Sequence, residues 1–280
     1  MTLSTPKFIF FGTPYVAKDT LAHLVKAGYV PSLVVTSPDA PKGRGQHLTP
    51  CETKTWALLH SLPVLSPEKI TREVIETIAT EGAEFALVVA YGKILPQSLI
   101  DVFPLGLLNV HYSLLPKYRG ASPVETALRS GDTMTGVSIQ KLVREMDAGD
   151  VLEEEEVSVH PNETTRELRP RLVQIGSELL VTTLERFLDG TALYTPQDPS
   201  AVTHTHKIAK EDGELSLAGD ALTNWNTYRA YAESPGTYFF MDRNGKSVRI
   251  KIVTASFDGK IFSPLRVVPE GKNEMDFSSL

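Results

Sequence analysis

The segment FIFFGTP, residues 8–14, decides the class of the fold. Its apolar run predicts a short buried strand at Phe8–Phe11, which the glycine and the proline that follow bring to an end. Tyr15–Ala27 continues as an amphipathic helix that stops at Gly28, and Leu33–Thr36 is a second short, β-branched strand. A strand, a helix and a strand in this order need a crossover connection, which predicts parallel strands and an α/β domain.

The alternation of helices and strands continues as far as residue 110. Helices are predicted at Glu52–His60 and Lys69–Ala79, and further strands at Phe85–Ala90 and Leu105–Val110. Ser37–Pro50, which holds prolines, glycines and basic residues, is predicted to be a polar loop. The pattern is typical of a Rossmann-like, mostly parallel sheet.

The glycine pattern argues against a dinucleotide or ATP as the ligand of this sheet. The dinucleotide fingerprint needs three spaced glycines between a strand and a helix, but the first strand is followed by Gly12 alone. Gly43 and Gly45 lie in a loop, and Leu48 stands where the third glycine is needed. No phosphate-cradling segment that ends in Gly-Lys-Ser or Gly-Lys-Thr is present.

The pattern changes after Gly131. Thr135–Val143 and Val151–Val159 predict a hairpin-like pair of strands, and Thr164–Leu188 has the apolar spacing of a long helix. Thr191–His206 is rich in proline and threonine, which predicts an extended linker.

The C-terminal region predicts a second, β-rich domain. A helix is expected near Ala221–Ala232, and short strands follow around the Asn244-Gly245 and Asp258-Gly259 turns. We therefore predict a small β-barrel-like (OB-like, truncated) domain. The predicted domains are 1–189 (catalytic), 190–206 (linker) and 207–280 (small and β-rich).

Composition excludes several classes of protein. The chain has 280 residues, 28 basic and 34 acidic side chains, a net charge of −6 and one cysteine, Cys51. This acidic balance argues against a basic nucleic-acid coat protein, and one cysteine cannot form an internal disulfide. The apolar runs are too short for a signal peptide or a membrane span. We expect a cytoplasmic monomer with no membrane partner.

The most informative polar residues lie at the end of the fourth predicted strand. Asn109 and His111 are two apart, so their side chains point to the same face beyond the carboxyl end of the strand. Open α/β sheets bind their ligands at that edge. Asp147, in a turn with Gly149 and Asp150, could orient the imidazole. Taken alone, the strand-end pair could equally cap a turn.

Three stretches carry a resemblance to a known family. They are NVHYSLLPKYRGASP (residues 109–123), GDTMTGV (131–137) and MDAGDVL (146–152). Together with FGTP (11–14), VAYGKILP (89–96) and SPGTY (234–238), this pattern resembles the 10-formyltetrahydrofolate-dependent formyltransferase family, most closely its members that formylate methionyl-tRNA. The resemblance covers most of residues 7–240.

The resemblance implies a reaction in which an amine attacks the formyl group that 10-formyltetrahydrofolate carries as co-substrate. Asn109 would then donate a hydrogen bond to the oxyanion, and His111 would support it or move the amine proton. Asp147 would hold His111, directly or through a water. The acceptor implied is initiator methionyl-tRNA, for translation initiation. We expect no metal, since His204 and His206 have no third ligand nearby.

The resemblance also implies binding residues. Those matching the family's folate site are Ser113, Leu114, Leu115, Pro116, Val89, Tyr91, Gly92 and Ile94. Those expected to contact tRNA are Lys42, Arg44, Lys207 and Lys210. Two plainer interpretations stay open, because 89–95 could simply end a core strand and the loop with Lys42 could be an ordinary solvated surface.

Two departures from the family pattern bear on the acceptor. Ala148 replaces a common threonine, a change that leaves the turn intact, and 207–280 is shorter than the family's usual second domain. The short tail keeps an alternative open, namely a formyltransferase that acts on an amino-sugar nucleotide. Hydrolysis of the formyl-folate, or a binding module without activity, would be further alternatives.

Overall fold

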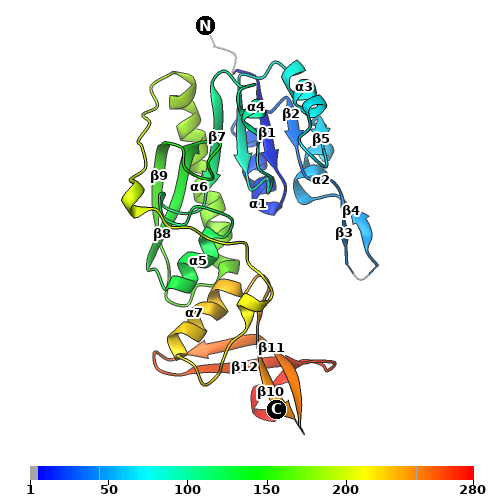
Figure 1. The fold of residues 1–280 in the computed structure, drawn as a ribbon, viewed down its shortest axis with the longest axis vertical. Helices are drawn as coiled ribbons and strands as arrows, with labels where there is room; N and C mark the ends of the chain where they lie inside the picture. The colour runs from blue at the N-terminus through cyan, green and yellow to red at the C-terminus, as the bar shows by residue number, and fades with distance from the viewer. Residues whose placement is uncertain (1–5, 44, 244) are drawn as a thin grey trace. The chain divides into compact units, whose positions relative to one another are not determined.

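The computed structural model describes residues 6–43, 45–243 and 245–280 (Figure 1). The chain divides into two compact units. The first contains the chain up to Arg119 together with Gly136–Glu156 and Pro170–Thr203, and the second contains Gly120–Thr135, Val157–Arg169 and His204–Leu280. These units cut across the domains expected at 1–189, 190–206 and 207–280, which stay a prediction.

A mostly parallel sheet organises the N-terminal two thirds of the chain. In the described residues it holds seven strands in the order β5-β2-β1-β6-β7-β8-β9. Their bounds are β1 Phe8–Gly12, β2 Leu33–Val35, β5 Val64–Leu65, β6 Phe85–Val89, β7 Gly106–His111, β8 Met134–Lys141 and β9 Val151–Ser158. Strand β1 pairs parallel with β2 and β6, β6 pairs parallel with β7, and β7 pairs antiparallel with β8. The predicted α/β class is confirmed.

The helices follow the predicted order. They are α1 Tyr15–Lys26, α2 Glu52–Leu59, α3 Arg72–Thr80, α4 Gln97–Ile100, α5 Pro123–Ser130, α6 Thr165–Leu188 and α7 Ala221–Tyr231. The predicted start of α3 at Lys69 is wrong by three residues, because Thr71 caps the helix and its side chain accepts from the Val74 amide. Two helices were not predicted, namely the short helix α4, which follows Pro96, and α5. Within the described residues, no helix is long and apolar enough to cross a membrane.

The apolar run that opens the chain lies in the core of the first unit. All five residues of β1 are buried, as are all five of β6. Strands covered on both faces read as continuous apolar runs, which explains why this segment predicted the fold. One core cluster includes Ile9, Phe11, Val35, Tyr91 and Leu99.

The predicted polar loop at 37–50 is wrong over part of its length. Strands β3 Ala40–Lys42 and β4 His47–Thr49 pair as a short antiparallel hairpin, with Lys42 opposite His47. Their side chains are mostly exposed, so the sequence has no apolar alternation that would reveal them. Arg44 lies outside the described residues.

The predicted linker is paired with the first unit for part of its length. Thr195 and Val151 form an antiparallel bridge in which each amide donates to the other's carbonyl, at 2.8 and 2.9 Å. A short 3-10 turn, η1 Pro199–Ala201, follows. The segment is thus ordered by hydrogen bonds that its composition did not predict.

A second sheet gives the second unit its core. Its strands, β10 Thr237–Arg243, β11 Lys246–Phe257, β12 Phe262–Pro269 and β13 Met275–Asp276, pair antiparallel in chain order. A cluster of Leu215, Phe239, Ile250, Ile252 and Val267 is buried beneath it. This antiparallel sheet confirms the prediction that the C-terminal region is rich in β-strands. Asn244, in the first predicted turn, lies outside the described residues.

Candidate active site

The carboxyl ends of the central strands meet at one edge of the sheet. Because β1, β6 and β7 run parallel, the loops after Gly12, Val89 and His111 leave from the same edge. The Thr13 hydroxyl lies 3.1 Å from the Tyr91 carbonyl, to which it donates, and it accepts from the Ser37 amide at 3.2 Å. These two bonds connect the segments that follow β1, β2 and β6 at this edge.

His111 is held in the site by a backbone contact. Its side chain ends β7 and is buried, whereas Asn109, on the same face, is half-buried. The Nε2 atom of His111 lies 2.9 Å from the carbonyl oxygen of Tyr118. A carbonyl only accepts, so Nε2 carries a hydrogen in this contact. Nδ1 is the ring nitrogen left to face the rest of the site.

Asp147 faces that second nitrogen. Its Oδ2 atom lies 3.7 Å from Nδ1 of His111, and the two side chains are 15% and 6% exposed. Asp147 adopts a left-handed backbone conformation with φ of 51°. Tertiary structure therefore brings together the imidazole and the carboxylate that the sequence singled out. Asn109 lies two residues before His111, on the same face of the strand.

Gln140 belongs to this site and was missed by the sequence analysis. It lies opposite Asn109 in the β7–β8 pairing, and its Nε2 donates to Oδ1 of Asp147 at 2.9 Å. Its side chain is buried, and its Oε1 has no hydrogen-bond partner among the described residues. The signal in the sequence was a glutamine next to Ile139 in a predicted strand. A polar side chain on such a strand needs a hydrogen-bond partner if it is buried.

The residues expected to contact folate after β6 divide into backbone and side-chain candidates. Val89 and Tyr91 are buried, and the Tyr91 ring packs edge-on against Phe11 with ring centroids 5.4 Å apart. Burial raises the pKa of Tyr91 to about 12. Gly92 has φ of 78°, and Ile94 is 78% exposed. Tyr91 can thus contribute only backbone at this edge, whereas Ile94 offers an apolar side chain.

The four folate candidates after β7 form an anchored loop. The hydroxyl of Ser113 donates to the Lys117 carbonyl at 2.6 Å, and the Leu115 amide donates to the hydroxyl of Ser138 at 3.0 Å. Ser138 is the cross-strand partner of His111. Leu114 and Pro116 lie on the same loop, so it leaves the strand next to the imidazole.

Three of the four residues expected to contact tRNA are described by the structure, and all three are exposed. Lys42 donates to Glu52 Oε1 at 2.8 Å, and this pair raises the pKa of Lys42 and lowers that of Glu52. Lys207 and Lys210 are exposed residues of the second unit. The fourth candidate, Arg44, cannot be placed because the structure does not describe it.

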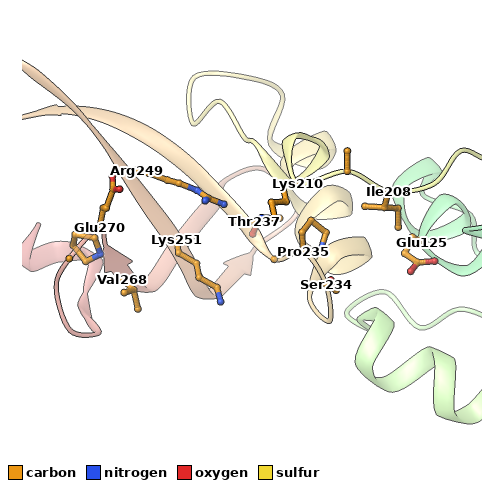
Figure 2. Close-up of a pocket in the computed structure, with 14 residues that line it drawn as sticks. Glu125, Ile208, Lys210, Ser234, Pro235, Thr237, Arg249, Lys251, Val268 and Glu270 are labelled. Carbon is orange, nitrogen blue, oxygen red and sulfur yellow. The ribbon is translucent and has the colours of Figure 1, made fainter. Parts of the chain in front are cut away.

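Lys210 lines a pocket of about 720 Å³ in the second unit (Figure 2). Arg249 and Lys251 of β11 line it too, as does Thr237, whose buried hydroxyl has no hydrogen-bond partner among the described residues. Two carboxylates, Glu125 and Glu270, complete its charged lining. The pocket was not predicted, since Lys210 and β11 are far apart in the chain.

The described part of the chain holds no group of three or more His, Cys, Asp or Glu side chains placed to share a metal ion. Of the paired histidines of the linker region, His206 lies 3.2 Å from Asp212, through Nε2 and Oδ2.

Comparison with known proteins gives a consistent result. Residues 6–184 match the family model described as formyl transferase. The methionyl-tRNA formyltransferase of Thermotoga sp. (strain RQ2) is 39% identical over 250 residues, which are 89% of this chain and 79% of that protein. The enzyme of the same name from Geobacter sulfurreducens is 38% identical over 267 residues, 95% of this chain and 84% of that protein.

Solved structures share the fold at lower identity. An N-formyltransferase from Helicobacter canadensis, in complex with folinic acid and dTDP-3-aminofucose, has a TM-score of 0.67 at 18% identity and covers 91% of this chain and 90% of its own. Phosphoribosylglycinamide formyltransferase from Bacillus halodurans has a TM-score of 0.56 at 22% identity, over 65% of this chain and 95% of its own. The extent of the family match and the identity to these relatives lead to one conclusion: the chain belongs to the formyl transferase family, among the methionyl-tRNA formyltransferases.

Proposed function

We propose that this chain transfers the formyl group of 10-formyltetrahydrofolate to the amino group of initiator methionyl-tRNA, with Asn109, His111 and Asp147 as its catalytic residues. The observation that carries the proposal is the placement of His111 between the Tyr118 carbonyl and the Asp147 carboxylate at the ligand edge of the sheet. Family membership supports the same reaction.

Each of the three side chains has a role that its position supports. Asn109 can donate from its amide to the oxygen that becomes negative as the amine attacks, a contact worth about 100- to 1000-fold in rate. His111 can take up the proton that the amine loses, since the ring is held through Nε2 and Nδ1 faces the site. Asp147 keeps the ring oriented, and Gln140 orients Asp147 by donating to its other oxygen.

The residues at the sheet edge fit a folate. 10-Formyltetrahydrofolate supplies an activated formyl group when it binds. Ala90 and Gly92, with φ of 46° and 78°, turn the peptide groups of this loop out of the regular strand direction. Such a loop can pair with the donors and acceptors on a pterin edge, and Ile94 can cover the ring. Val89, Tyr91, Gly92, Ile94 and Ser113–Pro116 are therefore proposed as the folate site.

For tRNA, we propose a few cationic contacts rather than a broad basic surface. The chain carries a net charge of −6, so phosphate contacts must be local. Lys42 is 64% exposed at its side chain, and its pair with Glu52 is a surface pair that a phosphate can replace. Lys207 and Lys210 are the contacts proposed in the second unit, and Arg249 and Lys251 join Lys210 around its pocket.

The amino-sugar nucleotide alternative has less support. The relatives at 38% and 39% identity carry the name methionyl-tRNA formyltransferase. The solved structure with a bound amino-sugar nucleotide is only 18% identical, a level that shows the fold alone.

One assay separates the two acceptors. Purified protein is supplied with 10-formyltetrahydrofolate and offered either charged initiator tRNA or a panel of amino-sugar nucleotides. Formylation of the tRNA alone is expected, whereas turnover of a sugar nucleotide without turnover of tRNA would overturn the proposal.

The variant Lys42→Ala should weaken tRNA binding and reduce the salt dependence of that binding. Lys246→Ala, an exposed lysine in β11 outside the pocket lining, is the matched control.

We also propose that the protein acts as a monomer in the cytoplasm. The support for the compartment is compositional, since a chain with a single cysteine fits a reducing environment. Sedimentation of the purified protein at assay concentration tests the oligomeric state, and a dimer mass would contradict it.

A further inference from the structure

The side chain of Gln197 makes four hydrogen bonds to residues that lie close to His111 and Asp147. It lies in residues 195–203, here called the strap, which the sequence predicted to be a linker. Its Nε2 donates to the carbonyls of Asp147 and Gly149, at 2.9 and 2.7 Å. Its Oε1 accepts from Nε and Nη2 of Arg119, at 3.0 and 2.8 Å. Because a carbonyl only accepts and a guanidinium only donates, these partners set the orientation of the amide without ambiguity.

Arg119 ties the strap to the loop that carries Asp147. The residue is 7% exposed, and a buried guanidinium needs its hydrogen bonds satisfied. Arg119 also forms an ion pair with Glu145, which lies two residues before Asp147. Its Nη1 is 3.5 Å from Oε1 of Glu145. Its backbone amide donates to the Thr203 carbonyl at 2.9 Å, so it contacts both ends of the strap.

The other end of the strap holds the group that fixes His111. The hydroxyl of Thr203 accepts from the Tyr118 amide at 2.8 Å, and the Thr203 amide donates to the Pro116 carbonyl at 3.3 Å. The carbonyl of the same Tyr118 is the partner of His111 Nε2. One segment therefore holds the backbone partner of the imidazole through Thr203, and the backbone of the carboxylate residue through Gln197.

Asp147 needs such support. Its left-handed conformation, with φ of 51°, is one that residues with a side chain rarely adopt, and it persists only where surrounding contacts hold it. The two bonds from Gln197 end on the carbonyls of Asp147 itself and of Gly149, which confine the turn on both sides. We expect that loss of both bonds would let the turn relax and would move Oδ2 away from His111.

We propose that the strap is part of the catalytic machinery, and that Gln197 is a positioning residue which fixes the Asp147 carboxylate against His111. Gln197 touches neither side chain of the pair and acts through the backbone of the turn. The inference rests on the proposed function, because its main readout is formyl transfer.

The variant Gln197→Glu tests the proposal with little change in size. A carboxylate still accepts from Arg119 but cannot donate to the two carbonyls. We expect kcat to fall about 10- to 100-fold, in keeping with the cost of an ångström-scale misplacement, while KM for either substrate changes little. Gln174→Glu on the exposed face of α6 is the matched control and should leave kcat unchanged.

Two further measurements separate positioning from a general loss of stability. If Gln197 acts through Asp147, Gln197→Glu should cost almost nothing in an Asp147→Asn background, because the contact that it positions is already lost. At the other end, Thr203→Val should lower kcat and Thr203→Ser should restore it, since only the hydroxyl accepts from the Tyr118 amide. Melting temperatures measured in parallel identify a variant that simply unfolds.

The outcomes are distinguishable. A wild type that does not formylate tRNA overturns the proposed function. The 15N shifts of the His111 ring, measured by NMR, then still test the strap, because they should differ between wild type and Gln197→Glu. Unchanged ring shifts and an unchanged kcat in Gln197→Glu would overturn the strap proposal, as would a full additive loss in the Asp147→Asn background.

Discussion

Replacing Tyr91 with phenylalanine isolates the effect of one buried hydroxyl at the proposed folate site. The ring is 2% exposed, and its Oη has no hydrogen-bond partner among the described residues. Burying a hydroxyl without a partner costs about 1–3 kcal/mol, so Tyr91→Phe should be more stable than wild type by about that amount at pH 7.

The same substitution should change how stability depends on pH. Burial raises the pKa of Tyr91 from 10.0 to about 12 in the folded protein. Below pH 10 both the folded and the unfolded state keep the proton, and stability does not depend on this group. Between pH 10 and pH 12 only the unfolded state ionises, so the folded protein loses stability as pH rises. At pH 11 the loss amounts to about 1.4 kcal/mol, which Tyr91→Phe should not show.

Urea unfolding at pH 8, 9, 10 and 11, followed by circular dichroism, measures this difference. Tyr194→Phe is the control, because that side chain is 42% exposed and should show a smaller alkaline difference from wild type. KM for 10-formyltetrahydrofolate should not change in Tyr91→Phe, since only the backbone of this residue can face the ligand. If wild type and Tyr91→Phe lose stability in parallel up to pH 11, the assignment of a buried, unpartnered hydroxyl is refuted.

Three further substitutions test the catalytic edge. Asn109→Ala should lower kcat about 100- to 1000-fold with little change in melting temperature, because the half-buried amide is expected to act on the developing oxyanion. His111→Ala should lower kcat about 100- to 10,000-fold while the fold stays intact, and near-wild-type turnover would contradict its role. Gly149→Ala places a Cβ 1.7 Å from the Lys141 carbonyl oxygen, so the backbone of the Asp147 turn must move. We expect a loss of about 1–3 kcal/mol in urea unfolding and a larger proportional loss of kcat, and a variant with wild-type values for both would show that the turn tolerates the shift.

Local signals predicted most of the first unit's framework. The apolar runs that became β1 and β6 are short, continuous and bounded by glycine or proline, a pattern that parallel strands buried on both faces impose. The same reasoning placed Asn109 and His111 together, because strand alternation puts residues two apart on one face. The hairpin at 40–49 escaped prediction because its side chains face solvent and leave no apolar period.

What the sequence by itself determined is therefore the α/β class, the β-rich tail and the identity of an amide, an imidazole and a carboxylate that could act together. Only tertiary structure decided how they are held. Gln140 contacts Asp147 from the strand just before its turn, and Gln197 contacts it from a segment 50 residues further along the chain. The Tyr91 ring packs into the core rather than toward the ligand edge. The physical reason is that propensity and periodicity are properties of neighbours along the chain. A hydrogen bond from residue 197 to residue 147 depends on the packing of the whole unit.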